Sequence, residues 1–329
     1  MGQILIGGVR LCPARFCAPL AGYTHSAFRR LAAEIGGCGA FWTEMLAARQ
    51  VLSEDFGRSP WLRWRPVEGM VFHQLMVRAD DPIERVLDRM EQHGVAAVDV
   101  NLACHAREIR SRKSGSALFE DLVALEQTIV RMRRHWPGVL TAKIRLGRQR
   151  PDWKDRFAER MRILAESGID AVILHPRFFE EKFKRRARHE LIPWAASLTR
   201  LPVIANGDLG GPDSVRQWGR HLEPAAGIMM GRMAVARPWL FAAWEQPIEV
   251  EPAAIWRRLY DYVLEDFEPA AALRRIQMFT KYFAANFQFG HAFRCAVGSA
   301  PSLEEARGRA EAFLAARPAM VSAPSVSGL

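Results

Sequence analysis

Residues 139–147 read VLTAKIRLG and residues 170–177 read DAVILHPR, with an amphipathic stretch at 153–167 between them. Short, nearly continuous apolar runs rich in β-branched residues are typical of parallel strands that are buried on both faces. The stretch between them has the apolar spacing of a helix. This strand–helix–strand unit therefore predicts a parallel sheet with helices packed on it.

The same alternation extends in both directions along the chain. Strands are predicted at 14–20, 40–45, 69–76, 95–103, 139–147, 170–177, 201–208 and 227–233. Helices are predicted at 24–36, 80–94, 119–135, 153–167, 212–221 and 234–243. Eight strands within about 245 residues match the size of a TIM (β/α)8 barrel, whereas an open doubly wound sheet rarely has so many.

The pattern changes near residue 251. Three helices are predicted at 251–266, 269–288 and 302–316, with no strand signal between them. We expect a TIM-barrel catalytic domain at 1–245 and a small C-terminal helical domain at 246–316. The tail at 317–329 is rich in small residues and proline, and we expect it to be disordered. The predicted fold class is therefore α/β.

Composition limits the class of protein. Hydrophobic residues make up 49% of the 329 residues, which excludes wholesale disorder. No run approaches the roughly 18 apolar residues of a membrane span, and the first residues, MGQILIGGVRLCP, do not resemble a signal peptide. The five cysteines form no CxxC pair, which suits a reduced cytoplasm. We therefore expect a cytoplasmic protein that does not enter a membrane.

Polar residues and glycines gather where the predicted strands end, and that edge of a TIM barrel carries its chemistry. Together with Pro19 and Leu20 at the end of the first strand, they are Glu44, Gln74, Asn101, Cys104, Lys143, Arg145, His175, Arg177, Asn206, Gly207, Asp208, Gly231 and Arg232. The glycines that end the seventh and eighth strands suit a phosphate, because it needs close backbone approach and N–H donors. Arg232 would add bidentate donors to such a site.

Each of these residues also has an ordinary structural explanation. Gln74 and His175 could be satisfied core groups, and Cys104 could be a small buried hydrophobe. Lys143 is harder to explain, because a lysine in a barrel wall is costly unless it meets an anion or a cofactor. The joint arrangement, with a suitable group at six separate strand ends, favours a site for a cofactor and a base.

The chain resembles the tRNA-dihydrouridine synthases, flavin-dependent enzymes that reduce uridine in folded tRNA. The resemblance runs from about residue 14 to 316. Its most specific stretches are APLAGYTHSAFRRL (18–31), TEM (43–45), DVNLACHA (99–106), SGSALF (114–119), KIRLG (143–147), PVIANGDL (202–209) and MMGRMAVARPWLF (229–241). RRIQMFTKYF (274–283) and the Phe-Arg pair at 293–294 resemble the RNA-binding domain of that family.

The resemblance implies FMN as cofactor, NADPH as reductant and Cys104 as the proton donor. Three residues would lie against the flavin ring, three would lie at its polar edge, and five would hold the ribityl chain and phosphate. In that order they are Pro19, Leu20 and Ala21, then Gln74, Lys143 and His175, then Asn206, Gly207, Asp208, Gly231 and Arg232. Asn101 would orient the base or the flavin.

The sequence also departs from the family pattern. His105 follows Cys104 where the family usually has proline, and Ala103 replaces a common glycine. A charged His105 would favour the thiolate of Cys104 and so weaken it as a proton donor. Alternatively, His105 would itself relay protons. These differences concern the substrate position more than the flavin site.

Charge adds a prediction about the partner. The net charge is +10, from 46 basic and 36 acidic residues, yet residues 251–316 hold eight of each, so the excess lies in the barrel. Basic clusters on three predicted loops at one rim favour a track for a phosphate backbone, although a solvated charged face would explain any one of them. The predicted RNA-binding residues are Asn101, His105, Arg107, Lys113, Arg145, Arg177, Lys184, Arg185, Arg186, Arg274, Lys281 and Arg294.

Three hypotheses remain open at this point. The first is an FMN- and NADPH-dependent tRNA-dihydrouridine synthase, a monomer that uses no metal and acts on tRNA. The second is an RNA-binding protein with the same scaffold and lost or altered catalysis. The third is a flavin reductase of a small pyrimidine metabolite.

Overall fold

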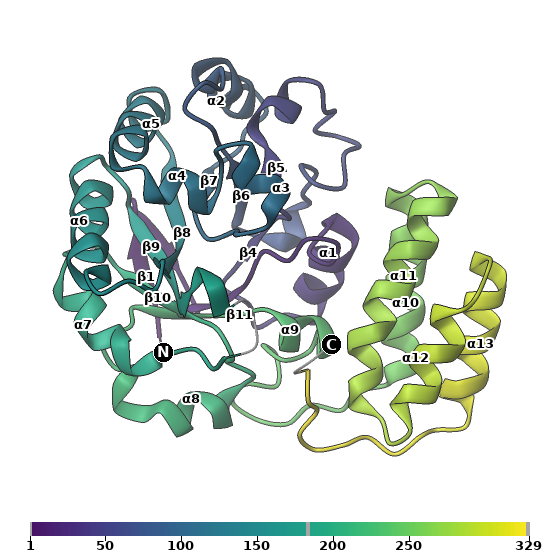
Figure 1. The fold of residues 1–329 in the computed structure, drawn as a ribbon. Helices are drawn as coiled ribbons and strands as arrows, with labels where there is room; N and C mark the ends of the chain where they lie inside the picture. Colours follow the sequence, from purple (N-terminus) through teal and green to yellow (C-terminus); the bar gives the residue numbers. More distant parts are fainter. Residues whose placement is uncertain (1, 182–184, 327–329) are drawn as a thin grey trace.

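The computed structural model describes residues 2–181 and 185–326. Among these residues, eight parallel strands close into a ring, because β4 pairs with β3 on one side and with β6 on the other. The short strand β5 lies beside the end of β6. The predicted TIM barrel is therefore confirmed, and its helices surround the strands (Figure 1).

The barrel strands coincide with the apolar runs of the sequence. They are β3 (Arg15–Cys17), β4 (Ala40–Trp42), β6 (Val71–Met76), β7 (Ala97–Asn101), β8 (Val139–Gly147), β9 (Ala171–Phe178), β10 (Val203–Asn206) and β11 (Gly227–Met230). The additional strand β5 (Leu46–Ala47) follows the predicted run at 40–45. Strands β7, β8 and β9 are buried along their whole length. This burial on both faces explains why their sequences are almost continuously apolar.

Most of the predicted barrel helices are present. The helices are α1 (Ser26–Ile35), α2 (Ile83–Gln92), α3 (Arg107–Ser111), α4 (Ser116–Glu120), α5 (Leu122–His135), α6 (Trp153–Glu166), α7 (Ile192–Ser197), α8 (Pro212–Trp218) and α9 (Arg232–Ala236). Helices α3 and α7 lie in segments for which no helix is predicted. Helix α9 begins at Arg232, before the predicted 234–243. It ends at Ala236, because Pro238 disfavours helical geometry in the residue before it.

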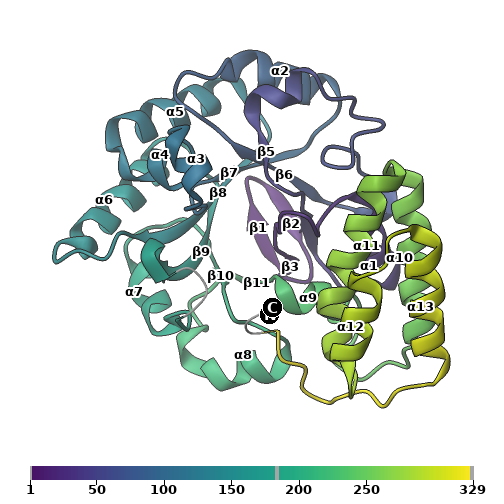
Figure 2. The ribbon, with the colours of Figure 1, turned by 45° about the vertical axis from the view of Figure 1, so that its right-hand side comes forward.

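A two-stranded hairpin that is missing from the predicted elements precedes the barrel. It consists of β1 (Ile4–Ile6) and β2 (Val9–Leu11), and it is seen through the ring of strands in Figure 2. Ile4, Ile6 and Leu11 are buried in one apolar cluster with residues of the barrel interior. The hairpin therefore closes the amino-terminal end of the barrel, which leaves the carboxyl end as the place for a site.

Four helices follow the barrel: α10 (Pro252–Asp266), α11 (Pro269–Phe283), α12 (Gly290–Gly298) and α13 (Leu303–Ala315). The single helix predicted at 269–288 is wrong in its extent, because α11 ends at Phe283 and a tight turn precedes α12. A Cβ on Gly290 would lie 1.9 Å from the carbonyl oxygen of Ala284, so a glycine is needed at this close approach. The boundaries of the domains at 1–245 and 246–316 stay a prediction.

The helical region is fixed to the barrel through helix α1. Helix α10 packs beside α1 in both views (Figures 1 and 2). The side chain of Asp266, at the end of α10, is fully buried and accepts hydrogen bonds from Ser26, Arg63 and Arg65 of the barrel. A buried carboxylate needs such partners, so this contact specifies how the two regions dock.

Replacing Asp266 with alanine is expected to lower the free energy of unfolding by about 1–3 kcal/mol, because Ser26, Arg63 and Arg65 lose their shared acceptor. Water can reach Arg63, whose side chain is 34% exposed, so the loss stays below that of a fully buried pair. Thermal and urea unfolding measure the change. Glu265→Ala is the matched control, since Glu265 is 52% exposed and pairs with Arg30 at the surface. Equal stability of the two variants would contradict the prediction.

The chain returns from α13 to the barrel along the edge of the molecule (Figure 1). The backbone N–H of Gln288 donates to the carbonyl of Ala319, and Arg237 donates to the carbonyls of Val321 and Ser322. The disorder predicted for 317–329 is therefore wrong for residues 317–326. The last three residues of the chain lie outside the described part. A proline-rich tail can be held by backbone hydrogen bonds that its side chains do not reveal.

Candidate functional site

One large cavity opens at the carboxyl ends of the barrel strands, with a volume of about 1990 Å³. It brings together Cys104 and all eleven residues predicted to bind the cofactor. Six of the predicted RNA-binding residues also line it, namely Asn101, His105, Arg145, Arg177, Arg185 and Arg186. The structure thus places at one site residues that come from strand ends all around the barrel.

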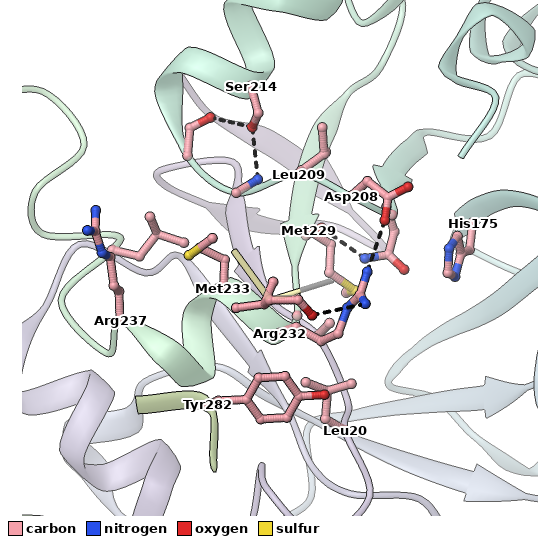
Figure 3. Close-up of a pocket in the computed structure, with 18 of the residues that line it drawn as sticks. Leu20, His175, Asp208, Leu209, Ser214, Met229, Arg232, Met233, Arg237 and Tyr282 are labelled. Carbon is pink, nitrogen blue, oxygen red and sulfur yellow. Dashed lines mark hydrogen bonds and ion pairs between the residues drawn. The ribbon is translucent and has the colours of Figure 1, made fainter. Parts of the chain in front are cut away.

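One end of the cavity is organised around Asp208, in the loop after β10. Its carboxylate accepts hydrogen bonds from Arg177 (2.6 Å), from Arg232 (3.0 Å) and from the backbone N–H of Ala187 (2.9 Å). These groups hold the pKa of Asp208 below its ordinary value despite its burial. Figure 3 shows Arg232 directed toward Asp208. Arg232 also donates to the carbonyl of Val326 at 3.4 Å. Asp208 therefore fixes the guanidinium of Arg232, the residue that is predicted from the sequence to bind a phosphate.

Gly207 allows His175 to lie against the loop after β10. The φ angle of Gly207 is +110°, and a Cβ there would lie 2.6 Å from Cδ2 of His175. The Nε2 atom of His175 is 2.5 Å from Nη1 of Arg177, and arginine only donates, so Nε2 acts as acceptor. Burial and the neighbouring cations hold the pKa of His175 well below its usual value, so this imidazole is neutral.

The side chain of Arg177 is too buried to contact RNA directly. Its side chain is only 2% exposed, and it donates to Asp208 and to the carbonyl of Arg185. Arg185 and Arg186 are exposed at the rim. In this structure Arg177 therefore supports the loop that carries those two arginines.

A row of hydrogen-bonded side chains crosses the floor of the cavity from β6 to β8. Gln74 donates to Asp99 (2.7 Å) and accepts from Asn101 (2.9 Å), while Thr141 donates to Asp99 (2.6 Å). Burial raises the pKa of Asp99 to about 6, even though Lys143 favours its ionised form. The row fixes the side chain of Gln74 and leaves one N–H of its amide for a ligand.

Lys143 lies on β8 next to this row, 8% exposed. Its ammonium makes no hydrogen bond with any residue that the structure describes. Burial, with Arg145 adding to it, lowers the pKa of Lys143 to about 8. A buried ammonium that faces a cavity without a hydrogen-bond acceptor is suited to a polar ligand.

Cys104 is held from both sides of its backbone. The Asn101 side chain accepts hydrogen bonds from the backbone N–H groups of Ala103 (3.1 Å) and Cys104 (2.9 Å), and the carbonyl of Cys104 accepts from the N–H of Ser116 (2.9 Å). The amide of Asn101 is therefore engaged in shaping this turn and in binding Gln74. The thiol itself remains half-buried at the cavity.

His105, the departure from the family pattern, is packed beside this turn. Its ring stacks on Phe179 at 4.9 Å, and Nδ1 lies 2.9 Å from Oγ of Ser116. Nε2 lies 3.4 Å from the guanidinium of Arg110, which only donates, so the proton is on Nδ1. Burial and Arg110 lower the pKa of His105, which favours the neutral ring at pH 7. His105 therefore places no positive charge beside Cys104 there.

The remaining predicted RNA-binding residues lie outside this cavity. Arg107 lines a smaller cavity nearby, and Lys113, Arg274, Lys281 and Arg294 line neither. Lys184 lies outside the described residues. The roles of all these residues stay predictions.

Several lining residues are missing from the predicted site. They include Tyr23, Arg237, Tyr282 and the tail segment 322–326. Tyr23, Arg237 and Tyr282 lie in the stretches that carry the family resemblance, which is the signal that could have indicated them. No pattern in the sequence indicates that the tail reaches the site, because its contacts are made largely by backbone carbonyls.

The chain matches the family described as "Dihydrouridine synthase (Dus)" over residues 16–316. It belongs to this family. Among curated Dus relatives, tRNA-dihydrouridine synthase B of Proteus vulgaris is 27% identical over 94% of this chain and 99% of its own length. The protein of the same name from Escherichia coli (strain K12) is 28% identical over 91% of this chain and 96% of its own length.

Solved structures share the barrel of this Dus protein. A variant of NCR from Zymomonas mobilis aligns with a TM-score of 0.54 at 14% identity, over 79% of this chain and 97% of its own. The old yellow enzyme from Trypanosoma cruzi aligns with a TM-score of 0.52 at 9% identity, over 78% and 95%. At such low identity these likenesses show the fold alone.

The described residues contain neither a membrane-spanning helix nor a metal-binding cluster. No helix there is both long and apolar enough to span a membrane. No group of three or more His, Cys, Asp or Glu side chains in the same residues is arranged to hold a metal ion.

Proposed function

We propose that this Dus-family protein is an FMN-dependent tRNA-dihydrouridine synthase that uses NADPH as reductant and Cys104 as proton donor. The observation that carries the proposal is the joint placement of Cys104 and the buried ammonium of Lys143 at one cavity. The curated relatives named above, tRNA-dihydrouridine synthases by name, support it over nearly the whole chain.

The residues present fit FMN. Lys143 offers a buried cation, Gln74 offers one amide N–H, and Arg232, held by Asp208, lines the same cavity and would bind the phosphate. Gly231 places no side chain in the cavity wall, and a Cβ built there would have no neighbouring atom closer than 3.5 Å. A volume of about 1990 Å³ exceeds the roughly 300–1,000 Å³ of a typical ligand pocket. The cavity therefore has room for a cofactor and a nucleotide together.

Each side chain would have its own role in the reaction. When bound, FMN would supply the hydride that reduces the C5–C6 double bond of uracil. The thiol of Cys104 would give its proton to the neighbouring carbon, and the turn fixed by Asn101 would keep that thiol at the cavity. Lys143 and Gln74 would orient the cofactor, with His175 neutral beside them.

The substrate would have to enter as an extruded base. A stacked uracil inside folded RNA cannot reach the mouth of a barrel, so loop uridines are favoured. Arg185 and Arg186 at the rim would bind the phosphate backbone around it, as the positive charge of the barrel predicts.

The proposed function is tested by mapping dihydrouridine at each position of cellular tRNA from strains with and without the gene. We expect one or a few positions to lose the modification when the gene is absent. Purified protein should carry FMN and restore those positions with NADPH. Unchanged tRNA would favour an RNA-binding protein without catalysis. Turnover of a free pyrimidine with no effect on tRNA would favour a small-molecule reductase.

Affinity for FMN is expected to fall as the pH rises through about 8, because Lys143 there loses the proton that makes it a cation. The sign follows from its lowered pKa, since the ammonium is fully present below about 8 and absent well above it. We expect a loss of about 10- to 100-fold, the range of one charge-assisted hydrogen bond. Equilibrium dialysis of FMN between pH 6 and 10 measures it.

The control for this pH dependence is Lys143→Met, which keeps the length of the side chain and removes the charge. Its affinity for FMN should be weak at pH 6 and nearly constant up to pH 10. A wild-type affinity that stays constant across pH 8, or a variant that retains the same pH dependence, would show that another group binds the flavin edge.

A further inference from the structure

A second cavity of about 510 Å³ lies beside the turn that carries Cys104. Its lining includes three arginines, Arg107, Arg110 and Arg148, and one glutamate, Glu120. The arginines come from α3 and from the loop after β8, which lie next to each other at the rim of the barrel (Figure 2). We call this space the arginine cavity.

The imidazole of His105 lines both the arginine cavity and the main cavity. The ring is fixed by stacking on Phe179 and by its contact with Ser116. Cys104, the adjacent residue, lines the main cavity. The space around the proposed proton donor and the arginine cavity therefore meet at one side chain.

The arginine cavity has an excess of positive charge. Glu120 is already paired with Arg160 at 3.0 Å and with Arg148 at 3.7 Å. Arg107 makes no hydrogen bond or ion pair with any of the residues that the structure describes. Arg110 makes only a long contact, 3.4 Å, with Nε2 of His105. Two guanidinium groups are therefore available to an anion, and guanidinium matches the geometry of phosphate.

We propose that the arginine cavity binds a phosphate of the RNA chain next to the nucleotide whose base lies in the main cavity. The inference rests on the proposed function, because it places the target base beside Cys104. In a nucleotide only the ribose separates base from phosphate, and here His105 lines both cavities. The bound phosphate would hold the base at the thiol, so Arg107 and Arg110 are positioning residues.

The proposal is tested by comparing two ligands on the FMN-loaded protein, uridine and uridine 3′,5′-bisphosphate. With FMN bound, its own phosphate site cannot take up the ligand. We expect the bisphosphate to bind at least about tenfold more tightly than uridine, as one charge-assisted contact predicts. In Arg107→Ala/Arg110→Ala the difference should fall below about threefold. Calorimetric titration or NMR titration gives both affinities.

Two controls separate a phosphate site from a general effect of charge. Arg112→Ala removes a cation from the same segment, but Arg112 is exposed and lines neither cavity, so the tenfold preference should remain. Arg107→Ala alone breaks no contact within the described residues, so it should lower the preference without changing the melting temperature. Equal losses in Arg112→Ala and in the double variant would overturn the proposal.

Further outcomes distinguish this inference from the proposed function. If dihydrouridine forms but wild type binds both ligands equally, the arginine cavity is not a phosphate site. If the double variant loses affinity for NADPH and keeps the preference for the bisphosphate, the cavity serves the reductant and the inference is overturned. If the preference depends on Arg107 and Arg110 while tRNA is never modified, the phosphate site stands and the proposed function fails.

Discussion

Replacing Cys104 with alanine is expected to slow the reduction of uridine in tRNA by about 10²- to 10⁴-fold, the usual contribution of a positioned general acid. The thiol lies at the main cavity, while the backbone on either side is fixed by Asn101 and Ser116. Alanine keeps those backbone contacts. The loss should therefore appear in the rate alone, with the melting temperature and the content of FMN unchanged.

Measuring the two half-reactions separately shows which of them Cys104→Ala slows. Reduction of the bound flavin by NADPH needs no proton from the thiol, so its rate in stopped-flow measurements should match wild type. Oxidation of the reduced flavin by tRNA should carry the whole loss. Cys295→Ala is the matched control, because Cys295 is exposed on α12 and lies outside both cavities. If Cys104→Ala kept an activity within about threefold of wild type, Cys104 would be excluded as the essential acid.

Much of this site could be predicted because side chains alternate between the two faces of a barrel strand in a regular way. Side chains two residues apart point to the same face, so the pair Lys143 and Arg145 and the pair His175 and Arg177 each face the interior near a strand end. The glycines after β10 and β11 are recognisable for a similar reason, because bare backbone at a strand end is unusual. These positions need no knowledge of long-range contacts.

What could not be predicted depends on partners that are distant in the sequence. Arg177 occupies a strand end like its neighbours, yet Asp208 binds its guanidinium from another loop. Asn101 looks like a residue that binds substrate, but its amide is occupied by the turn at Cys104. The strands of the N-terminal hairpin have three residues each, which is too short for a periodic pattern to develop.

The second large effect concerns Arg29, which lies in the stretch APLAGYTHSAFRRL and is fully buried. Its guanidinium donates to Glu68 (2.7 Å) in the 3-10 turn Pro66–Glu68, to the carbonyl of Thr24 (2.8 Å) and to the carbonyl of Arg63 (2.5 Å). Thr24 ends the loop that begins at Pro19 and lines the cavity. Arg29 therefore joins that loop to the segment around Arg63, which docks the helical region.

Replacing Glu68 with alanine is expected to destabilise the protein by about 3–5 kcal/mol, because it leaves the charge of Arg29 without its counter-ion in a site closed to water. This is a large part of the roughly 5–15 kcal/mol that holds a domain folded. Urea unfolding measures the change. Glu166→Ala is the control, since Glu166 pairs with Arg162 at the surface and should cost less than about 1 kcal/mol.

A second variant tests whether the charge itself causes the loss. Arg29→Met/Glu68→Leu removes both ions, so the penalty for an unpaired buried charge disappears. Recovery should be only partial, because the carbonyls of Thr24 and Arg63 then lack their donor. FMN should bind more weakly in both variants, since the loop at Pro19 loses its anchor. If Glu68→Ala were as stable as wild type, Arg29 would be held by the two carbonyls alone, and the ion pair would not be what fixes this loop beside the cavity.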